Sequence, residues 1–162
     1  MLWSRNCFLG FLAVASLYGC GFHLQGRELL PADMLRIHVV AEDQQSDFIE
    51  ALRSGLRTSG AELTSDEKSA TAVIRVKRDE LTQKVLAVSS RNLPREYELT
   101  YRVQVSVNAG AQLLMDNQEL ELTRNFTFDE REVLAKEHER DQLRGELARE
   151  LAASLLRRLR SR

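Results

Sequence analysis

The chain has 162 residues, a formal net charge of −1 and two cysteines. This length fits one domain with a substantial hydrophobic core, and the near-zero charge gives no support for a nucleic-acid partner. Removal of residues 1–19 as an export signal would leave one cysteine, which excludes an internal disulfide in the mature chain.

The first segment in chain order is typical of an export signal. Arg5 makes the start positive, an apolar run covers residues 7–17, and Gly19 precedes Cys20. The run is shorter than the roughly 20 apolar residues of a membrane-spanning helix. The cysteine after the cleavage point resembles a bacterial lipoprotein signal, in which the cysteine thiol receives a diacylglycerol. A plain cleaved signal and a buried N-terminal helix are the alternatives.

The first predicted strand covers residues 34–41. Its residues alternate, with Leu35, Ile37 and Val39 on one side of the strand. We expect the side that carries these three apolar residues to be buried.

A short amphipathic helix is predicted next. Ser46 or Asp47 is a suitable N-cap, and Asp47 and Glu50 have a spacing like that of a capping box. Gly60 stands where helices commonly end. The residues expected on the buried face are Phe48, Ile49, Leu52 and Leu56.

Two further strands are predicted on either side of a turn. Residues 72–78 open a strand whose apolar pattern resumes over residues 85–88 after a polar interruption. Residues 89–94 have the composition of a turn. The clearest alternation in the chain then runs over residues 97–107, which predicts a half-buried strand with one wet face.

This alternation continues beyond Gly110 to Leu113, so we expect a long strand in which Gly110 permits a bulge or bend. Asp116 and Asn117 are predicted to form a turn. Apolar residues alternate again over residues 120–128, which predicts an antiparallel hairpin closed at that turn.

From about Asp129 onward the pattern becomes helical. The apolar stripe is wide, short and follows a period of 3.6 residues. It therefore predicts a helix that covers the sheet and not a coiled coil. The stripe consists of Leu143, Leu147, Ala148, Leu151, Ala152, Leu155, Leu156 and Leu159.

The order strand, helix, strand, strand, strand, helix predicts an α/β fold. We expect a two-layer sandwich in which two helices pack on one four-stranded sheet, leaving the other sheet face to solvent or a partner. Residues 20–33 are predicted to be a lipidated N-terminus and tether, and residues 34–162 a single domain.

The sequence lacks the patterns of common active sites. His23, His38 and His138 are far apart, and none has a cysteine or second histidine at metal-ligand spacing. The sequence contains neither a Gly-rich phosphate loop nor a Gly-x-Ser-x-Gly elbow. Its carboxylate pairs alternate with arginine or lysine, as on a solvated helix face. We expect a binding or assembly role, without a cofactor or metal, and not an enzyme.

Several short motifs occur along the chain in one order. Cys20-Gly21-Phe22-His23-Leu24 begins the predicted mature protein. Arg91-Asn92 and Glu96-Tyr97-Glu98-Leu99 come next, followed by Arg124-Asn125-Phe126 and Leu134-Ala135-Lys136. In this order behind a lipoprotein signal, these motifs resemble the LptE family of lipopolysaccharide-assembly lipoproteins. The resemblance covers essentially the whole chain.

The resemblance implies an outer-membrane lipoprotein whose Cys20 carries N-palmitoyl and S-diacylglycerol groups. It implies that the folded domain lies on the periplasmic side or inside the lumen of the β-barrel LptD, which it plugs and helps to assemble. It also implies binding of lipopolysaccharide during delivery to the outer leaflet. Gly21 suits outer-membrane sorting. The alternative is a membrane-tethered periplasmic carrier or chaperone for an amphiphilic lipid, without a barrel partner.

The resemblance further implies basic residues that bind lipopolysaccharide, and two positions match. Arg91 lies in the predicted turn before the long strand, and Lys136 lies at the start of the last helical region. The lipid A and core phosphates are what such cations would meet, and arginine binds phosphate in a forked geometry. For both residues the alternative is an ordinary solvated surface charge.

Overall fold

The computed structural model describes residues 30–127 and 133–161, without the side chains of residues 32 and 133–136. The predicted signal at residues 1–19, Cys20 and nearly all of the predicted tether lie outside this range. In the described part, no helix has the length and apolar character that a membrane crossing requires.

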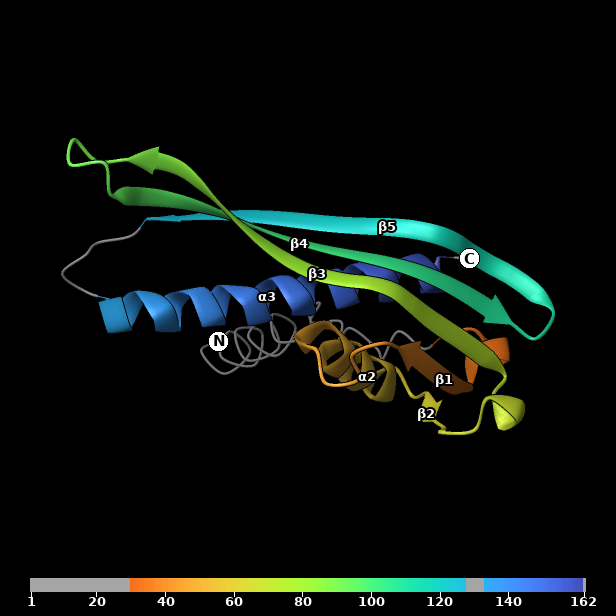
Figure 1. Cartoon of the computed structure of the whole chain (residues 1–162). Helices are drawn as coiled ribbons and strands as arrows, with labels where there is room; N and C mark the ends of the chain where they lie inside the picture. The colour runs from red at the N-terminus through yellow and green to blue at the C-terminus, as the bar shows by residue number, and fades with distance from the viewer. Residues whose placement is uncertain (1–29, 128–132, 162) are drawn as a thin grey trace, which may run out of the picture.

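The described elements form one mixed sheet with two long helices beside it (Figure 1). Both helices lie on the same side of the three long strands, so the fold has two layers. The elements in chain order are η2 (Ala32–Met34), β1 (Arg36–Ala41), α2 (Asp47–Thr58), β2 (Glu62–Leu63), η3 (Glu67–Ser69), β3 (Ala72–Val88), β4 (Pro94–Ala109), β5 (Gln112–Thr127) and α3 (Val133–Arg160).

The sheet has five strands in the order β2-β1-β3-β4-β5, and not the four that the sequence predicted. β1 is parallel to both β2 and β3, whereas β4 is antiparallel to β3 and β5. The additional strand, β2, has only two residues, Glu62 and Leu63. Such a short strand has no alternation to detect, which explains why the prediction missed it. The α/β class and the two helices are confirmed.

The start of β1 differs from the prediction. A 3-10 turn precedes the strand, closed by the Met34 N–H on the Pro31 carbonyl at 2.9 Å. The turn places Met34 in the core and leaves Leu35 56% exposed, so the expectation that Leu35 is buried was wrong. Ile37 and Val39 are buried as predicted.

α2 agrees with the predicted helix. The Ser46 side-chain oxygen accepts the Ile49 N–H at 3.2 Å, so Ser46 and not Asp47 is the N-cap. Beyond the C-terminal end, Gly60 has a φ of 85°, which favours glycine. The buried side chains are Phe48, Ile49, Leu52 and Leu56, as predicted.

β3 is a single strand of 17 residues. It continues without a break through the predicted polar interruption after Arg78. A register shift between Val76 and Arg78 marks a bulge against β4. The predicted turn between β3 and β4 is confirmed, and Asn92 takes a φ of 64° within it.

The turn between β4 and β5 lies at Gly110 and not at the predicted Asp116 and Asn117. Ala109 pairs with Gln112, and Gly110 takes a φ of 55°. Asp116 and Asn117 form a bulge inside β5, where the Asn117 N–H donates to the Ser106 hydroxyl at 3.1 Å. Both places suit a positive φ, so residue type alone did not distinguish the turn from the bulge.

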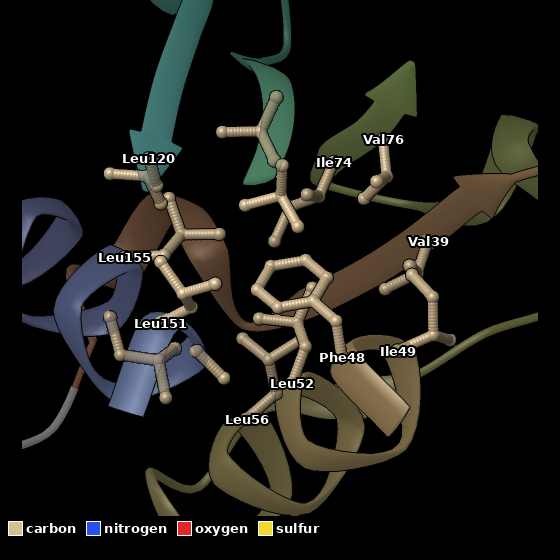
Figure 2. Packing of buried hydrophobic residues seen from close by; sticks show 14 of the residues in the cluster. Val39, Phe48, Ile49, Leu52, Leu56, Ile74, Val76, Leu120, Leu151 and Leu155 are labelled. Atoms are coloured by element: carbon tan, nitrogen blue, oxygen red, sulfur yellow. The ribbon is translucent and has the colours of Figure 1, made fainter. Parts of the chain in front are cut away.

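The core lies between the sheet and the two helices, where side chains of α2 and α3 meet those of β1 and β3 (Figure 2). The helices approach closely at Gly55, since a Cβ there would lie 2.5 Å from the Leu156 Cδ1 atom. The apolar stripe of α3 faces this core as predicted: Leu147, Ala148, Leu151, Ala152, Leu155, Leu156 and Leu159 are buried, and Leu143 packs at its margin.

Candidate functional site

Arg91 lies in the turn that joins β3 to β4. The turn is closed by the Ser89 N–H on the Leu93 carbonyl at 2.7 Å and by the Asn92 N–H on the Ser89 carbonyl at 2.9 Å. The Leu93 N–H also donates to the Ser89 hydroxyl, at 3.2 Å. These bonds fix the turn backbone, while the Arg91 side chain is exposed and has no ion pair within the described residues.

Lys136 lies in the first turn of α3, which begins at Val133; the structure does not describe its side chain. The β3–β4 turn and the first turn of α3 lie at the same end of the molecule, opposite to the β4–β5 turn (Figure 1). The fold therefore brings the segments that carry Arg91 and Lys136 to one end. Cys20, the third predicted site residue, lies outside the described range.

The end that carries Arg91 is rich in cations, although Glu96 and Glu98 of β4 lie opposite Ala87 and Lys84. Lys84 is near the end of β3, and Arg95 is the second residue of β4. From residue 81 to residue 95 the sequence contains these three cations and no carboxylate. This hairpin end, defined here as residues 84–95, can therefore hold an anion by charge, with arginine available for forked contacts to phosphate oxygens.

The open face of the sheet differs from this end because its charges are compensated. Arg102 on β4 lies 3.2 Å from Glu119 and 2.6 Å from Glu121, both on β5. The hydrogen bond and charge of Glu121 raise the pKa of Arg102 above its ordinary value. The Thr100 and Thr123 hydroxyls are 3.1 Å apart on the same face. This part of the open face is therefore polar, and Arg102 is paired with carboxylates.

The sequence did not predict a polar cluster that lies between the start of α2 and the sheet. Asp79 on β3 accepts a hydrogen bond from the Tyr101 hydroxyl at 2.7 Å and another from the Ser46 hydroxyl. Burial and the Asp79 carboxylate raise the pKa of Tyr101. Beside this cluster, Arg144 of α3 pairs with Asp47 of α2. The bulge at residue 77 turns Asp79 toward the core side, a change that alternation does not reveal.

This cluster holds the start of α2 on the sheet. A tyrosine with a raised pKa keeps its proton at neutral pH, so its hydroxyl is a hydrogen-bond donor and a poor nucleophile. Within the part of the chain that the structure describes, no group of three or more His, Cys, Asp or Glu side chains is arranged to hold a metal ion.

Comparison with known proteins gives consistent results. The LptE family model, described as lipopolysaccharide-assembly, matches residues 34–159. Proteins called LPS-assembly lipoprotein LptE from Pectobacterium atrosepticum and Photorhabdus laumondii are 27% and 25% identical to the chain; the matches cover 91% of this chain and 80% and 81% of those proteins.

A solved structure, an uncharacterized lipoprotein B from Nitrosomonas europaea, is 26% identical with a TM-score of 0.67. The match covers 85% of this chain and 88% of that one. The family model spans β1 through nearly the whole of α3, including the turn that carries Arg91. The chain belongs to the LptE family of lipopolysaccharide-assembly proteins.

Proposed function

We propose that this protein is a lipoprotein of the outer membrane that plugs and helps to assemble an LptD β-barrel, and that binds lipopolysaccharide during its delivery to the outer leaflet. The observation that carries the proposal is the family match over residues 34–159. The relatives named LPS-assembly lipoprotein LptE support it. The proposed role is one of binding and assembly, without catalysis.

The proposed anchor is Cys20, acylated after removal of residues 1–19, with residues 20–33 as a tether to one domain over residues 34–162. Three acyl chains on one residue exceed the two signals that stable anchoring requires. A mass spectrum of the mature N-terminus tests cleavage and acylation together. Cys20→Ala should give an uncleaved or soluble product, and normal membrane fractionation of this variant would contradict the anchor.

The uncovered face of the sheet supports the barrel partner. Because both helices lie on the opposite side, the faces of β3, β4 and β5 that carry Thr100 and Arg102 remain open to a second surface (Figure 1). Purification of the membrane-extracted protein in detergent should yield a stable complex with a large outer-membrane barrel. A monomer that extracts lipopolysaccharide from micelles without a barrel would instead identify a tethered carrier.

Arg91 and Lys136 are the proposed lipopolysaccharide contacts. They come from two segments that lie at one end of the molecule, and Arg91 is exposed without an ion pair inside the described ranges. Charge-assisted bonds to phosphate are stronger than those between neutral groups. We therefore expect Arg91→Asp with Lys136→Asp to weaken lipopolysaccharide binding and to leave barrel association intact.

The matched control is Arg57→Asp with Arg158→Asp, which makes the same change of charge on two exposed arginines near the C-terminal ends of α2 and α3. This control should bind lipopolysaccharide as the unchanged protein does. Equal binding by both double variants would remove Arg91 and Lys136 from the site. Circular dichroism of each variant separates a binding defect from a folding defect.

A further inference from the structure

The hairpin end carries an unusual share of exposed apolar side chains. In the described part of the chain six large hydrophobic residues are exposed, and four of them lie here: Val85 at 43%, Leu86 at 41%, Val88 at 54% and Leu93 at 39%. The other two are far from this end: Leu35 lies just before β1, and Leu113 is the second residue of β5, next to the β4–β5 turn. Single exposed apolar residues are common, but a cluster of them marks a binding surface.

This cluster continues the apolar side of the sheet. Val85 on β3 lies opposite Tyr97 on β4, and Tyr97 lies opposite Phe126 on β5. The Tyr97 and Phe126 rings stack with their centroids 5.3 Å apart, and Phe126 is buried. An apolar row therefore runs from the covered part of the sheet out to Val85, so the exposed residues extend an existing apolar surface.

The hairpin end contributes more cations than carboxylates to the surroundings of this cluster. It carries Lys84, Arg91 and Arg95, whereas the carboxylates next to it are Glu96, opposite Ala87, and Glu98, opposite Lys84. An uncharged apolar partner would use the apolar side chains but not the cations. An amphiphile with acyl chains and negative groups would contact both. Apolar side chains next to lysine and arginine are the combination by which protein segments bind anionic lipids.

We propose that the hairpin end binds acyl chains of lipopolysaccharide against Val85, Leu86, Val88 and Leu93, while its cations face the phosphates. This inference rests on the proposed function for the identity of the ligand, and it adds a hydrophobic subsite to the charged one. Contact between the acyl chains and these apolar side chains removes both from water, which supplies affinity that charge alone does not.

A single tryptophan tests contact with the chains. In a full chain that carries Trp3→Phe, Leu86→Trp places the only tryptophan in the hairpin end, and Leu113→Trp places it at the opposite end of the sheet with similar exposure. Lipopolysaccharide should shift the emission of the first variant to shorter wavelength and leave the second unchanged. De-acylated lipopolysaccharide should shift neither.

Loss of the apolar surface provides the second test. Leu86→Gln with Val88→Gln should weaken binding of acylated lipopolysaccharide about tenfold, because two apolar contacts are lost. Binding of the de-acylated form and association with the barrel should not change. Arg91→Asp should instead weaken binding of both forms, since both retain phosphate.

The outcomes that overturn the proposal are distinct. Lipopolysaccharide binding without an emission shift at residue 86, or without loss in the double glutamine variant, removes the acyl subsite and leaves the proposed function intact. If phosphatidylglycerol vesicles shift the emission of the Leu86→Trp variant as far as lipopolysaccharide does, the hairpin end inserts into a membrane surface, and this result overturns the proposal as well. A protein that binds neither form of lipopolysaccharide removes the ligand and both proposals with it.

Discussion

The two halves of β3 have opposite surroundings. In the first half, residues 72–76 pair with β1 on one side and β4 on the other, and Ala72, Ile74 and Val76 are buried. In the second half β1 has ended, and residues 82–88 are all exposed. One strand thus belongs to the core at one end and to a surface at the other. Stability and binding are therefore expected to respond to different substitutions.

The largest expected effect on stability comes from the core that covers the first half of β3. Phe48 of α2 is fully buried between the sheet and the helices (Figure 2). Phe48→Ala should lower the free energy of unfolding by about 3–5 kcal/mol, because it loses transfer energy and leaves a cavity. Urea unfolding followed by circular dichroism measures this. A loss below about 1 kcal/mol would mean that the core collapses onto the gap.

The contact between the two helices should give the next largest effect. Gly55→Val places a branched side chain where even a Cβ would lie 2.5 Å from the Leu156 Cδ1 atom. We expect a loss of about 2–3 kcal/mol from overpacking and from poorer alignment of the helices. In a double-mutant cycle with Leu156→Ala, the combined loss should be smaller than the sum of the single losses. Additive losses would show that the two positions do not press on each other.

The Tyr101–Asp79 pair should give a smaller effect that depends on pH. Burial and Asp79 raise the pKa of Tyr101 in the folded state, whereas unfolded tyrosine has its ordinary pKa of about 10. The protonated hydroxyl is thus favoured on folding. Its contribution is complete below about pH 10 and falls as pH rises further, because the unfolded chain then loses its proton more easily.

Tyr101→Phe tests this. At about pH 8 the variant should be less stable by about 1 kcal/mol, through the lost hydrogen bond to Asp79. The difference from the unchanged protein should shrink at about pH 11, where Tyr101 no longer favours the folded state to the same degree. A difference that stays constant between the two pH values would contradict the raised pKa.

The elements that form the core were largely predictable because their sequence patterns are local and repeated. The alternation from Tyr97 to Val107 and the apolar face of α2 each depend on several residues that agree. The Ser46 cap follows from hydroxyl chemistry next to an apolar run. By contrast, β2 has two residues and owes its existence to pairing with β1.

The candidate site was predictable only in part. Turn chemistry placed Arg91 in a turn, and the structure confirms it. The choice between Gly110 and Asn117 for the next turn failed because both residues suit a positive φ. The exposure of Leu86 and Val88 was not predictable either, since apolar strand residues are normally buried and only the tertiary arrangement shows which part of a strand lacks a cover.

The smallest effect on stability is expected in the exposed half, and it is the sharpest test of the comparison. Leu86 and Val88 are each more than two-fifths exposed, so Leu86→Gln with Val88→Gln removes little buried surface. Unfolding free energy should change by less than about 0.5 kcal/mol, the usual range for surface substitutions. The same protein should bind acylated lipopolysaccharide about tenfold more weakly. If instead its stability falls as far as in Phe48→Ala, the hairpin end belongs to the core, and the separation between a stabilising half and a binding half of β3 is wrong.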